Sequence, residues 1–394
     1  MNTPRPSARN DRLEQLRNEK MARSAHAYVR GSTVQFYEWL HSQRGRRLPQ
    51  GPQVWICGDC HAGNLGPTGD LAGGIDMHIR DLDQTVIGNP VHDLVRLALS
   101  LATAARGSDL PGVTTARMLE EMMRGYRVAF SARAAEPMER PAQVATGMRT
   151  AVKRTWKHLA RERIENARPT IPAGKHFWSM SKVEKEAVAE LCAGPELHQL
   201  VTGLKGRKND AAVQLLDSAY WVKGCSSLGL LRYAVLLGVG EGEDQSYCLV
   251  DIKQAVAAAA PRAARAAMPR DNSRRVVEGA RHLSPALGDR MLATRFLDRG
   301  VFVRELMPQD MKLELDTLSQ ADAMRAAGYL ARVVGTAHAR QMDAATRRDW
   351  LAELKRDRSD DLAAPSWLWT SVVQLVGSHE EGYLQHCRRY ALRC

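Results

Sequence analysis

Oxygen-bearing side chains gather within residues 54–101, and their types and spacing suit phosphate chemistry. Asp59 and Asn64 lie five residues apart in a polar loop that follows a short apolar run. Asp81 and Asp83 end the next strand-like run. Carboxylate and amide oxygens are suitable ligands for a hard divalent cation, which in turn binds phosphate. The pattern therefore predicts a magnesium site that serves phosphoryl chemistry.

The pair Asp81 and Asp83 contributes most to this prediction. Because the two residues are two positions apart, both carboxylates point to the same side of an extended segment. Two like charges about 4 Å apart repel by roughly 1 kcal/mol in water and by roughly 4 kcal/mol at a partly buried site. A bound magnesium ion would remove that repulsion. A solvated loop rich in Asp and Gly accounts for any one of these acids alone, whereas the ordered set favours a functional site.

The spacing also matches that of protein kinases. Asn64 follows Asp59 by five residues, as the Asn of a kinase catalytic loop follows the catalytic Asp. Asp81 lies seventeen residues beyond Asn64, where a metal-binding Asp on a strand is expected. Apolar residues on one face predict a helix from residue 91 onward.

The loop Gly58–Asn64, with the sequence GDCHAGN, resembles the GD-x-H-x-x-N loop of aminoglycoside phosphotransferases and choline kinases. Residues 80–94 resemble the metal-binding strand of those enzymes and the helix that follows it. A closer resemblance is to an uncharacterised bacterial family, domain of unknown function 2252, which carries GDxHxxNFG and NDFDE stretches. The chain departs from that family in reading NLG at residues 64–66 for NFG and RDLDQ at residues 80–84 for NDFDE, and the last change, at Gln84, replaces a carboxylate by an amide.

The resemblance implies a role for each residue of the set. Asp59 orients an acceptor hydroxyl or accepts its proton, and His61 supports the same catalytic loop. Asn64, Asp81 and Asp83 hold magnesium against the phosphates of ATP.

Three other residues are assigned by the same resemblance. Asp93, at the start of the helix from residue 91, receives a structural role beneath the loop. His338, near the end of a helix expected at residues 322–342, is expected to pack in the core and not to act in catalysis. Arg30 either reaches the phosphates or forms a surface ion pair.

A second region, at about residues 215–310, has the pattern of a sheet that covers a nucleotide. Strand-like runs at 219–223, 230–237 and 246–252 are joined by glycine-containing turns, and two more runs follow at 291–297 and 301–306. The first turn holds the predicted nucleotide-binding residues Gly224, Ser226, Ser227 and Gly229. Glycines allow the backbone to approach phosphates, because no side chain intervenes.

Lys253 ends the third strand-like run of this region. Residues 250–253 (VDIK) resemble the V-A-I-K strand of kinases, whose Lys contacts the α- and β-phosphates. A short helix follows with Glu278 near its middle, and this acid is expected to pair with Lys253 as in active kinases. After the last strand, residues 307–310 are expected to form a hinge beside adenine, and Lys312 is expected to touch a phosphate or the substrate.

These parts predict an α+β, protein-kinase-like, two-lobe fold in circularly permuted order. In kinases the lysine sheet precedes the catalytic and metal-binding segments, whereas here it follows them. The expected organisation is a disordered tail at 1–10, a large helical lobe at 11–210 and 313–394, and a small antiparallel β lobe at 211–312. Such a permutation is physically tolerable because the ends of a domain often lie close together at its surface.

Bulk properties narrow the function further. The chain of 394 residues has a net charge of +12, which suits acidic partners such as nucleotides. Nucleic acid is not expected, because aromatic residues do not alternate with the basic ones as in single-strand binders. No apolar run approaches the length of a membrane span, and the N-terminus lacks a secretory h-region, so a cytoplasmic protein is expected. Seven scattered cysteines argue against a disulfide framework.

The first function predicted is an ATP- and magnesium-dependent phosphotransferase that acts on a hydroxyl of a small molecule or of a protein. Two alternatives remain open. One keeps the fold and transfers AMP to a protein, and the other is a catalytically silent protein that binds or senses a nucleotide.

Overall fold

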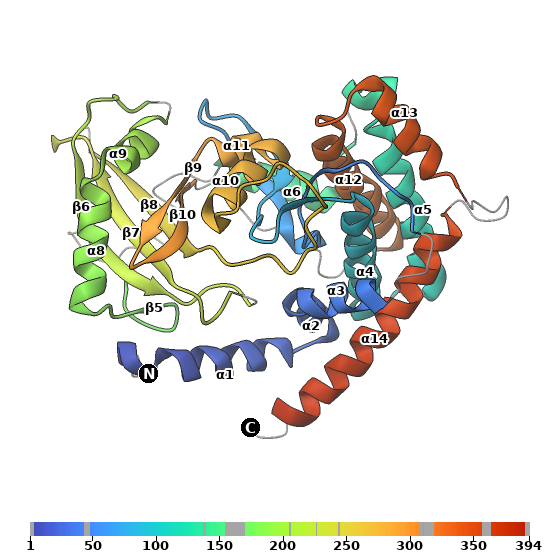
Figure 1. Cartoon of the computed structure of the whole chain (residues 1–394), viewed down its shortest axis with the longest axis horizontal. Coiled ribbons are helices and arrows are strands. Elements are labelled where there is room, and N and C mark those ends of the chain that lie inside the picture. Colours follow the sequence, from blue (N-terminus) through green and yellow to red (C-terminus); the bar gives the residue numbers. More distant parts are fainter. Residues whose placement is uncertain are drawn as a thin grey trace.

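The computed structural model contains a β-rich part and a larger helical part, which lie side by side in Figure 1. It describes residues 4–42, 48–136, 139–153, 170–204, 206–225, 227–242, 245–307, 310, 319–356 and 364–390. Helices and antiparallel sheets are both present, which confirms the α+β class.

The β-rich part is built on a six-stranded antiparallel sheet in the order β5-β6-β7-β8-β10-β9. Its strands are β5 (Phe177–Trp178), β6 (Val213–Trp221), β7 (Arg232–Val239), β8 (Ser246–Gln254), β9 (Met291–Phe296) and β10 (Arg299–Leu306). Helix α10 (Asn272–Leu283) lies between β8 and β9 in the chain. The five expected strand-like runs correspond to β6 through β10, although β6 begins earlier than the expected residue 219.

The two faces of this sheet have different neighbours, because side chains alternate along each strand. Ile252 of β8 points to the face that helices α8 (Lys182–Ala193) and α9 (Pro195–Thr202) cover with apolar side chains. The next residue, Lys253, points to the opposite face. Because α8 and α9 pack on the sheet, they belong to the β-rich part, which differs from their expected place in the helical lobe at 11–210.

Helix α1 (Arg9–Met21) is fixed at its start to the β-rich part. The buried guanidinium of Arg9 donates to both carboxylate oxygens of Glu184, at 2.6 and 3.0 Å. Glu184 and Ser181 also form the capping box that begins α8, which the Ser-x-x-Glu spacing of residues 181–184 predicts. The structure differs from the expected disordered tail at 1–10, because α1 begins inside that range and its first residue is buried.

The other end of α1 is fixed to the helical part. Nε2 of His386, on α14 (Ser366–Tyr390), lies 2.9 Å from the carbonyl oxygen of Asn18. The hydroxyl of Tyr383, on the same helix, donates to the carbonyl of Ala22 at 3.2 Å. Helix α1 therefore connects the two parts, and Figure 1 shows it running along the lower edge of the molecule.

Three long helices form the centre of the helical part: α4 (Val91–Gly107), α5 (Gly112–Val128) and α12 (Gln320–Ala339). Helices α5 and α12 approach each other closely where Gly125 faces Gly328. A Cβ atom on Gly125 would lie only 1.9 Å from the carbonyl oxygen of Gly328. Glycine is therefore required at this crossing by packing.

Shorter helices complete the fold around these three. They are η1 (Pro6–Ala8), α2 (Ala25–Gly31), α3 (Thr33–Ser42), η2 (Ala62–Asn64), η3 (Ala132–Ala135), α6 (Ala142–Lys153), α11 (Pro285–Gly288) and α13 (Ala344–Glu353). Within the part of the chain that the structure describes, no helix is both long and apolar enough to cross a membrane.

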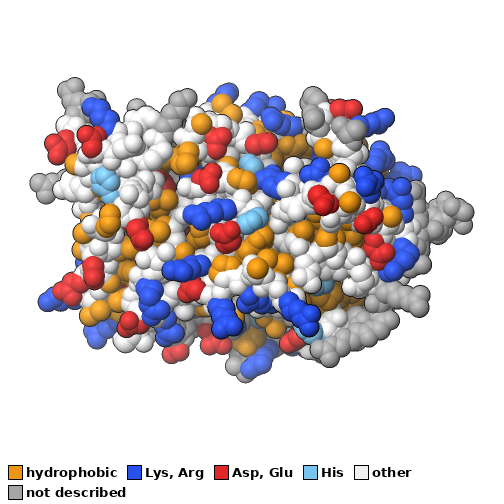
Figure 2. All heavy atoms as spheres, turned by 45° about the horizontal axis from the view of Figure 1, so that its top comes forward, with side chains coloured by type: hydrophobic (Ala, Val, Ile, Leu, Met, Phe, Trp, Pro, Cys, Tyr) orange, Lys and Arg blue, Asp and Glu red, His pale blue; other side chains and the backbone are white. Residues whose placement is uncertain are grey.

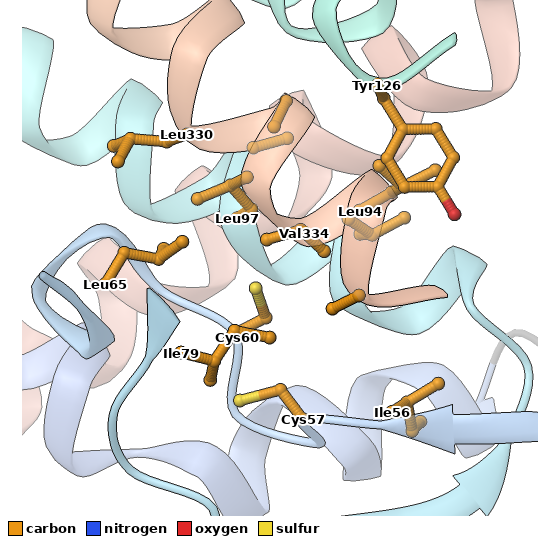
Figure 3. Close-up of a cluster of buried hydrophobic side chains, with 14 of the residues drawn as sticks. Ile56, Cys57, Cys60, Leu65, Ile79, Leu94, Leu97, Tyr126, Leu330 and Val334 are labelled. Carbon is orange, nitrogen blue, oxygen red and sulfur yellow. The ribbon is translucent and has the colours of Figure 1, made fainter. Parts of the chain in front are cut away.

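The core of the helical part lies directly under the predicted catalytic loop. Figure 3 shows Cys60 with its sulfur directed toward Leu97 of α4 and Val334 of α12. Cys57 and Cys60 are both fully buried and both are free thiols. The CxxC pair therefore contributes to core packing beneath the loop.

Two small sheets frame the loop from the sides. One pairs β1 (Val54–Ile56) with β4 (Val86–Gly88), and the other pairs β2 (Leu65–Gly69) with β3 (Ile75–Ile79). The strand expected at 77–83 thus ends at Ile79, and its two acids lie in the loop that follows.

Protein stability is expected to increase as the pH rises from about 4 to 7, partly through His379 of α14. The side chain is 1% exposed, and its Nδ1 lies 2.9 Å from the carbonyl oxygen of Leu375. Burial, followed by the charge of Arg96, lowers the pKa of His379 to about 4. The unfolded chain binds a proton in this range that the folded protein excludes, so the free energy of unfolding gains up to about 3 kcal/mol from this residue.

Urea unfolding at several pH values, compared with a His379→Gln variant, measures this contribution. The variant is expected to show a shallower rise of stability with pH. An identical slope in both proteins would contradict the assignment of this proton to His379.

Candidate functional site

The predicted catalytic loop begins where β1 ends, and its first turn requires glycine. Gly58 has a φ of +75°, and a Cβ atom there would lie 2.1 Å from the carbonyl oxygen of Gln84. Only glycine meets both conditions, since it has no Cβ and tolerates a positive φ. The turn brings Asp59 next to the loop that carries Asp81 and Asp83.

Beneath the turn, the buried carboxylate of Asp93 fixes the backbone of the loop. It accepts hydrogen bonds from the amide nitrogens of Cys57 and Gly58, at 2.7 and 2.9 Å. Nε2 of His338 lies 3.1 Å from the same carboxylate, and its Nδ1 lies 2.9 Å from the hydroxyl of Tyr126. These contacts agree with the structural role expected for Asp93 and with the core position expected for His338.

Asp59 forms a buried ion pair with Arg96 of α4. Nε of Arg96 donates to the Asp59 carboxylate at 2.9 Å, and another guanidinium nitrogen donates to the carbonyl of Val29 at 2.6 Å. Burial raises the pKa of Asp59 above its usual value, although the charge of Arg96 opposes that effect. The amide nitrogen of Asn64 donates to the backbone carbonyl of Asp59 at 2.9 Å, so its amide oxygen is the atom left to serve as a ligand.

His61 lies in the same loop as a buried ring. Burial, followed by the charges of Arg30 and Arg96, keeps the pKa of His61 well below its usual value. The guanidinium of Arg30 lies 3.3 Å from the position that a Cβ atom on Gly63 would occupy. Arg30 of α2 therefore packs against the catalytic loop, and His61 between these cations is neutral at pH 7.

The structure brings Lys253 of β8 to the acids of the first region, although 170 residues separate Lys253 from Asp83. Nζ of Lys253 contacts the carboxylate of Asp83 and lies 3.7 Å from Oδ1 of Asp81. The lysine side chain is 4% exposed, whereas that of Asp81 is 51% exposed. The predicted lysine and the two predicted metal-binding aspartates thus share one site, with the Asp81 side chain half-exposed.

The acids of this site influence one another. Partial loss of hydration among the neighbouring side chains acts to raise the pKa of Asp81, but the charge of Lys253 outweighs it and holds the pKa below its usual value. Burial, followed by the charge of Asp81, raises the pKa of Asp83. The charge of Asp81 also acts to raise the pKa values of Asp59 and His61. Asp81 is therefore close enough to the catalytic loop to influence the charge of both residues.

The glycine turn after β6 packs on the ends of α1 and α2. Gly224 and Gly229 have φ angles of +93° and +102°, which favour glycine. Nζ of Lys20 donates to the carbonyl of Gly224 at 2.9 Å, and the hydroxyl of Ser227 points back to the carbonyl of Lys223 at 3.4 Å. Ser226, also predicted to bind the nucleotide, lies outside the described residues.

Arginines add positive charge on the Lys253 face of the sheet. Arg232 lies opposite Lys253 on β7 and donates two hydrogen bonds to Asp251, at 2.9 and 2.6 Å. Arg304 of β10 donates to the same carboxylate at 3.1 Å. One acid thus contacts two arginines here, while Lys253 is paired with Asp83 and lies near Asp81.

Asp310 fixes the segment that follows β10. Its carboxylate accepts hydrogen bonds from Arg290, at 2.9 and 3.1 Å, and from the amide nitrogen of Met307 at 3.1 Å. The expected hinge residues 308–309 and Lys312 lie outside the described residues.

The donor set fits a magnesium–nucleotide complex. Within the described residues, no group of three or more His, Cys, Asp or Glu side chains is arranged to hold a metal ion. Asp81 and Asp83 could supply two carboxylates to a metal ion, and Asn64 could supply an amide oxygen. Magnesium is usually bound through one or two carboxylates together with substrate phosphates and waters, which matches this set.

A family model described as an uncharacterised protein conserved in bacteria (DUF2252) matches residues 9–389. The chain belongs to the DUF2252 family. No protein with curated annotation and no solved structure matches the chain significantly. The family resemblance found in the GDCHAGN loop is therefore confirmed for nearly the whole of this DUF2252 protein.

In this DUF2252 protein, Glu278 does not meet Lys253. Its carboxylate lies 3.8 Å from Arg281 and 3.6 Å from His282, and its side chain is 40% exposed. Lys253 instead contacts Asp83. The expected Lys253–Glu278 ion pair is corrected accordingly, because the helix turns Glu278 toward solvent.

Arg275, one turn earlier on α10, makes a different connection, to the backbone of the acidic loop. Its buried guanidinium donates to the carbonyl oxygens of Asp83 at 3.0 Å, Val256 at 2.9 Å and Thr85. The sequence alone does not show which of the adjacent residues Arg274 and Arg275 points inward, because that depends on how the helix is rotated against the sheet. Arg275 therefore fixes the acidic loop to the β-rich part.

An Arg275→Ala variant of this DUF2252 protein is expected to lose about 3 kcal/mol of unfolding free energy, because three buried carbonyls lose their donor. Urea unfolding measures the loss. Arg274→Ala is the matched control, since Arg274 is exposed on the same helix and is expected to change stability by less than about 0.5 kcal/mol. Equal effects of the two substitutions would contradict this role.

Proposed function

We propose that this DUF2252 protein is an ATP- and magnesium-dependent phosphotransferase that acts on a hydroxyl acceptor. The observation that carries the proposal is the contact of Lys253 with Asp83, beside Asp81 and the Asp59–Asn64 loop. A cation for phosphates and oxygen ligands for a metal lie together there, as phosphoryl transfer requires.

Each residue has a role that its surroundings support. The oxygens of Asn64, Asp81 and Asp83 would hold magnesium, which when bound neutralises charge on the phosphates. Lys253 would exchange its carboxylate partners for phosphate oxygens. Asp59 would accept the proton of the acceptor hydroxyl, a role that its raised pKa favours.

The arrangement of the β-rich part supports a kinase-like fold whose segments occur in circularly permuted order. A strand pair with a glycine turn precedes the lysine strand β8, and α10 follows before β9 and β10. The apolar side chains Ala234, Leu249 and Leu306 lie on the same face as Lys253 and are buried in an apolar cluster there. The helix that would precede the catalytic loop is α12, and its His338 reaches the Asp93 carboxylate beneath that loop.

Small molecules or proteins are the proposed acceptors, and nucleic acid is not. Figure 2 shows acidic and basic side chains both present over the face in view. Nucleic-acid binding depends on basic residues gathered along the path of the backbone.

The proposal is tested by incubating the purified protein and a cell extract with magnesium and with ATP labelled at either the γ- or the α-phosphate. Label transferred from the γ-position, with a mass gain of one phosphate on the product, is the expected result. Transfer from the α-position would identify AMP transfer and would reject phosphotransfer.

A second candidate function is nucleotide binding without transfer, and two contacts favour it. Glu278 pairs with its helix neighbours Arg281 and His282, and the carboxylate of Asp59 is paired with Arg96. Calorimetry distinguishes the candidates: ATP binding with no label transferred to any component of the extract would support this second function.

A further inference from the structure

A pocket of about 540 Å³ opens between β3 and the C-terminal half of α12. None of the residues proposed to bind nucleotide or magnesium lines it. Its volume falls in the range of pockets that hold metabolites or cofactors. The pocket is therefore large enough to be a separate binding site.

Positive charge dominates the polar lining of this pocket. Three arginines line it, Arg140, Arg332 and Arg340, with Asp76 as the one carboxylate. Arg332 is held in place because it donates to the carbonyl oxygens of Arg133 and Ala134, at 3.3 and 2.9 Å. Those carbonyls fix the guanidinium without neutralising its charge, so the pocket retains a net positive charge.

The rest of the lining is apolar and aromatic. Met77, Leu283 and Val333 line the pocket, and the first two are almost fully buried. Tyr329 adds an aromatic side chain that is 8% exposed. A few charged side chains beside an apolar lining are typical of sites that bind organic anions. The charges orient the acidic group of the ligand, and the lining packs against its apolar part.

We propose that this pocket binds a small organic anion, a phosphate or carboxylate attached to an apolar body, at a site separate from the Lys253 cleft. The position gives such a ligand an effect on the cleft. β3 leads directly to Asp81, and the last turn of α12 carries His338 to Asp93. A ligand that bridges β3 and α12 therefore stabilises both elements that position the catalytic loop and its acids.

Calorimetric titration of the full chain with phenyl phosphate tests the proposal. The wild-type protein is expected to bind, and Arg340→Gln and Arg140→Gln are each expected to weaken binding about tenfold or more, as loss of a charged hydrogen bond does. Asp76→Asn is expected to strengthen binding several-fold, because it removes the one opposing charge. Arg325→Gln, exposed on the same helix outside the pocket, is the matched control and is expected to bind as the wild type does.

Two further titrations identify the preferred acidic group of the ligand and the site at which it binds. Benzoate in place of phenyl phosphate shows which acid is preferred, and inorganic phosphate is expected to bind more weakly than either because it lacks the apolar body. Lys253→Met is expected to leave phenyl phosphate binding unchanged. The proposal is overturned if none of the three compounds binds, or if affinity is lost in Lys253→Met but kept in Arg340→Gln and Arg140→Gln.

Discussion

An Asp81→Ala variant is expected to transfer phosphate about 100- to 1,000-fold more slowly than the wild type and to bind the magnesium–ATP complex more weakly. The half-exposed Asp81 carboxylate lies 3.7 Å from Lys253 and next to Asp83, so it is the most accessible acid of the site. Its removal deletes one magnesium ligand and leaves Lys253 paired with Asp83 alone. Labelled-ATP assays give the rate, and calorimetry gives the affinity.

Asp59→Asn separates proton transfer from binding. Turnover is expected to fall by a similar factor because an amide cannot accept the hydroxyl proton, while magnesium–ATP affinity stays close to that of the wild type. Asp109→Asn is the control, since Asp109 is exposed beyond the end of α4 and Asn tolerates its positive φ of 53°. Wild-type turnover in either Asp59→Asn or Asp81→Ala would reject the proposed phosphotransfer.

The largest stability loss is expected from Asp93→Ala, at about 3–5 kcal/mol. The buried carboxylate serves the amide nitrogens of Cys57 and Gly58 and the ring of His338, so its removal leaves buried donors without an acceptor. The free energy of unfolding from urea titration measures this loss.

Asp349→Ala is the control for Asp93→Ala, because Asp349 is exposed on α13 and its removal is expected to change stability by less than about 0.5 kcal/mol. A loss below about 1 kcal/mol for Asp93→Ala would show that the loop does not depend on this acid.

The sequence predicted those features that depend on local pattern. The capping box at Ser181, the lysine strand and the helix from residue 91 follow from turn chemistry, apolar runs and helical periodicity. The proximity of Lys253 to Asp81 and Asp83 was predicted only from the resemblance to protein kinases, in which the corresponding lysine and acids share one site.

Features set by long-range geometry were missed. Spacing placed Glu278 on a helix but did not give the rotation of that helix against the sheet, and Arg275 faces inward instead. Residues 65–69 (LGPTG) contain two glycines and a proline, which are uncommon inside strands, yet they pair with β3. The fixed start of α1 depends on Glu184, 175 residues away, and no local pattern reveals such a partner.

Helix α1 has a mechanical consequence for the cleft. Its start is bonded to α8 and its end to α14, so the helix resists a separation of the two parts along its axis. Arg275 adds a connection beside the Lys253 site, because it joins α10 to the loop that carries Asp83. In the proposed phosphotransferase, a nucleotide would therefore have to reach Lys253 past the exposed Asp81 side chain, without a wide separation of the two parts.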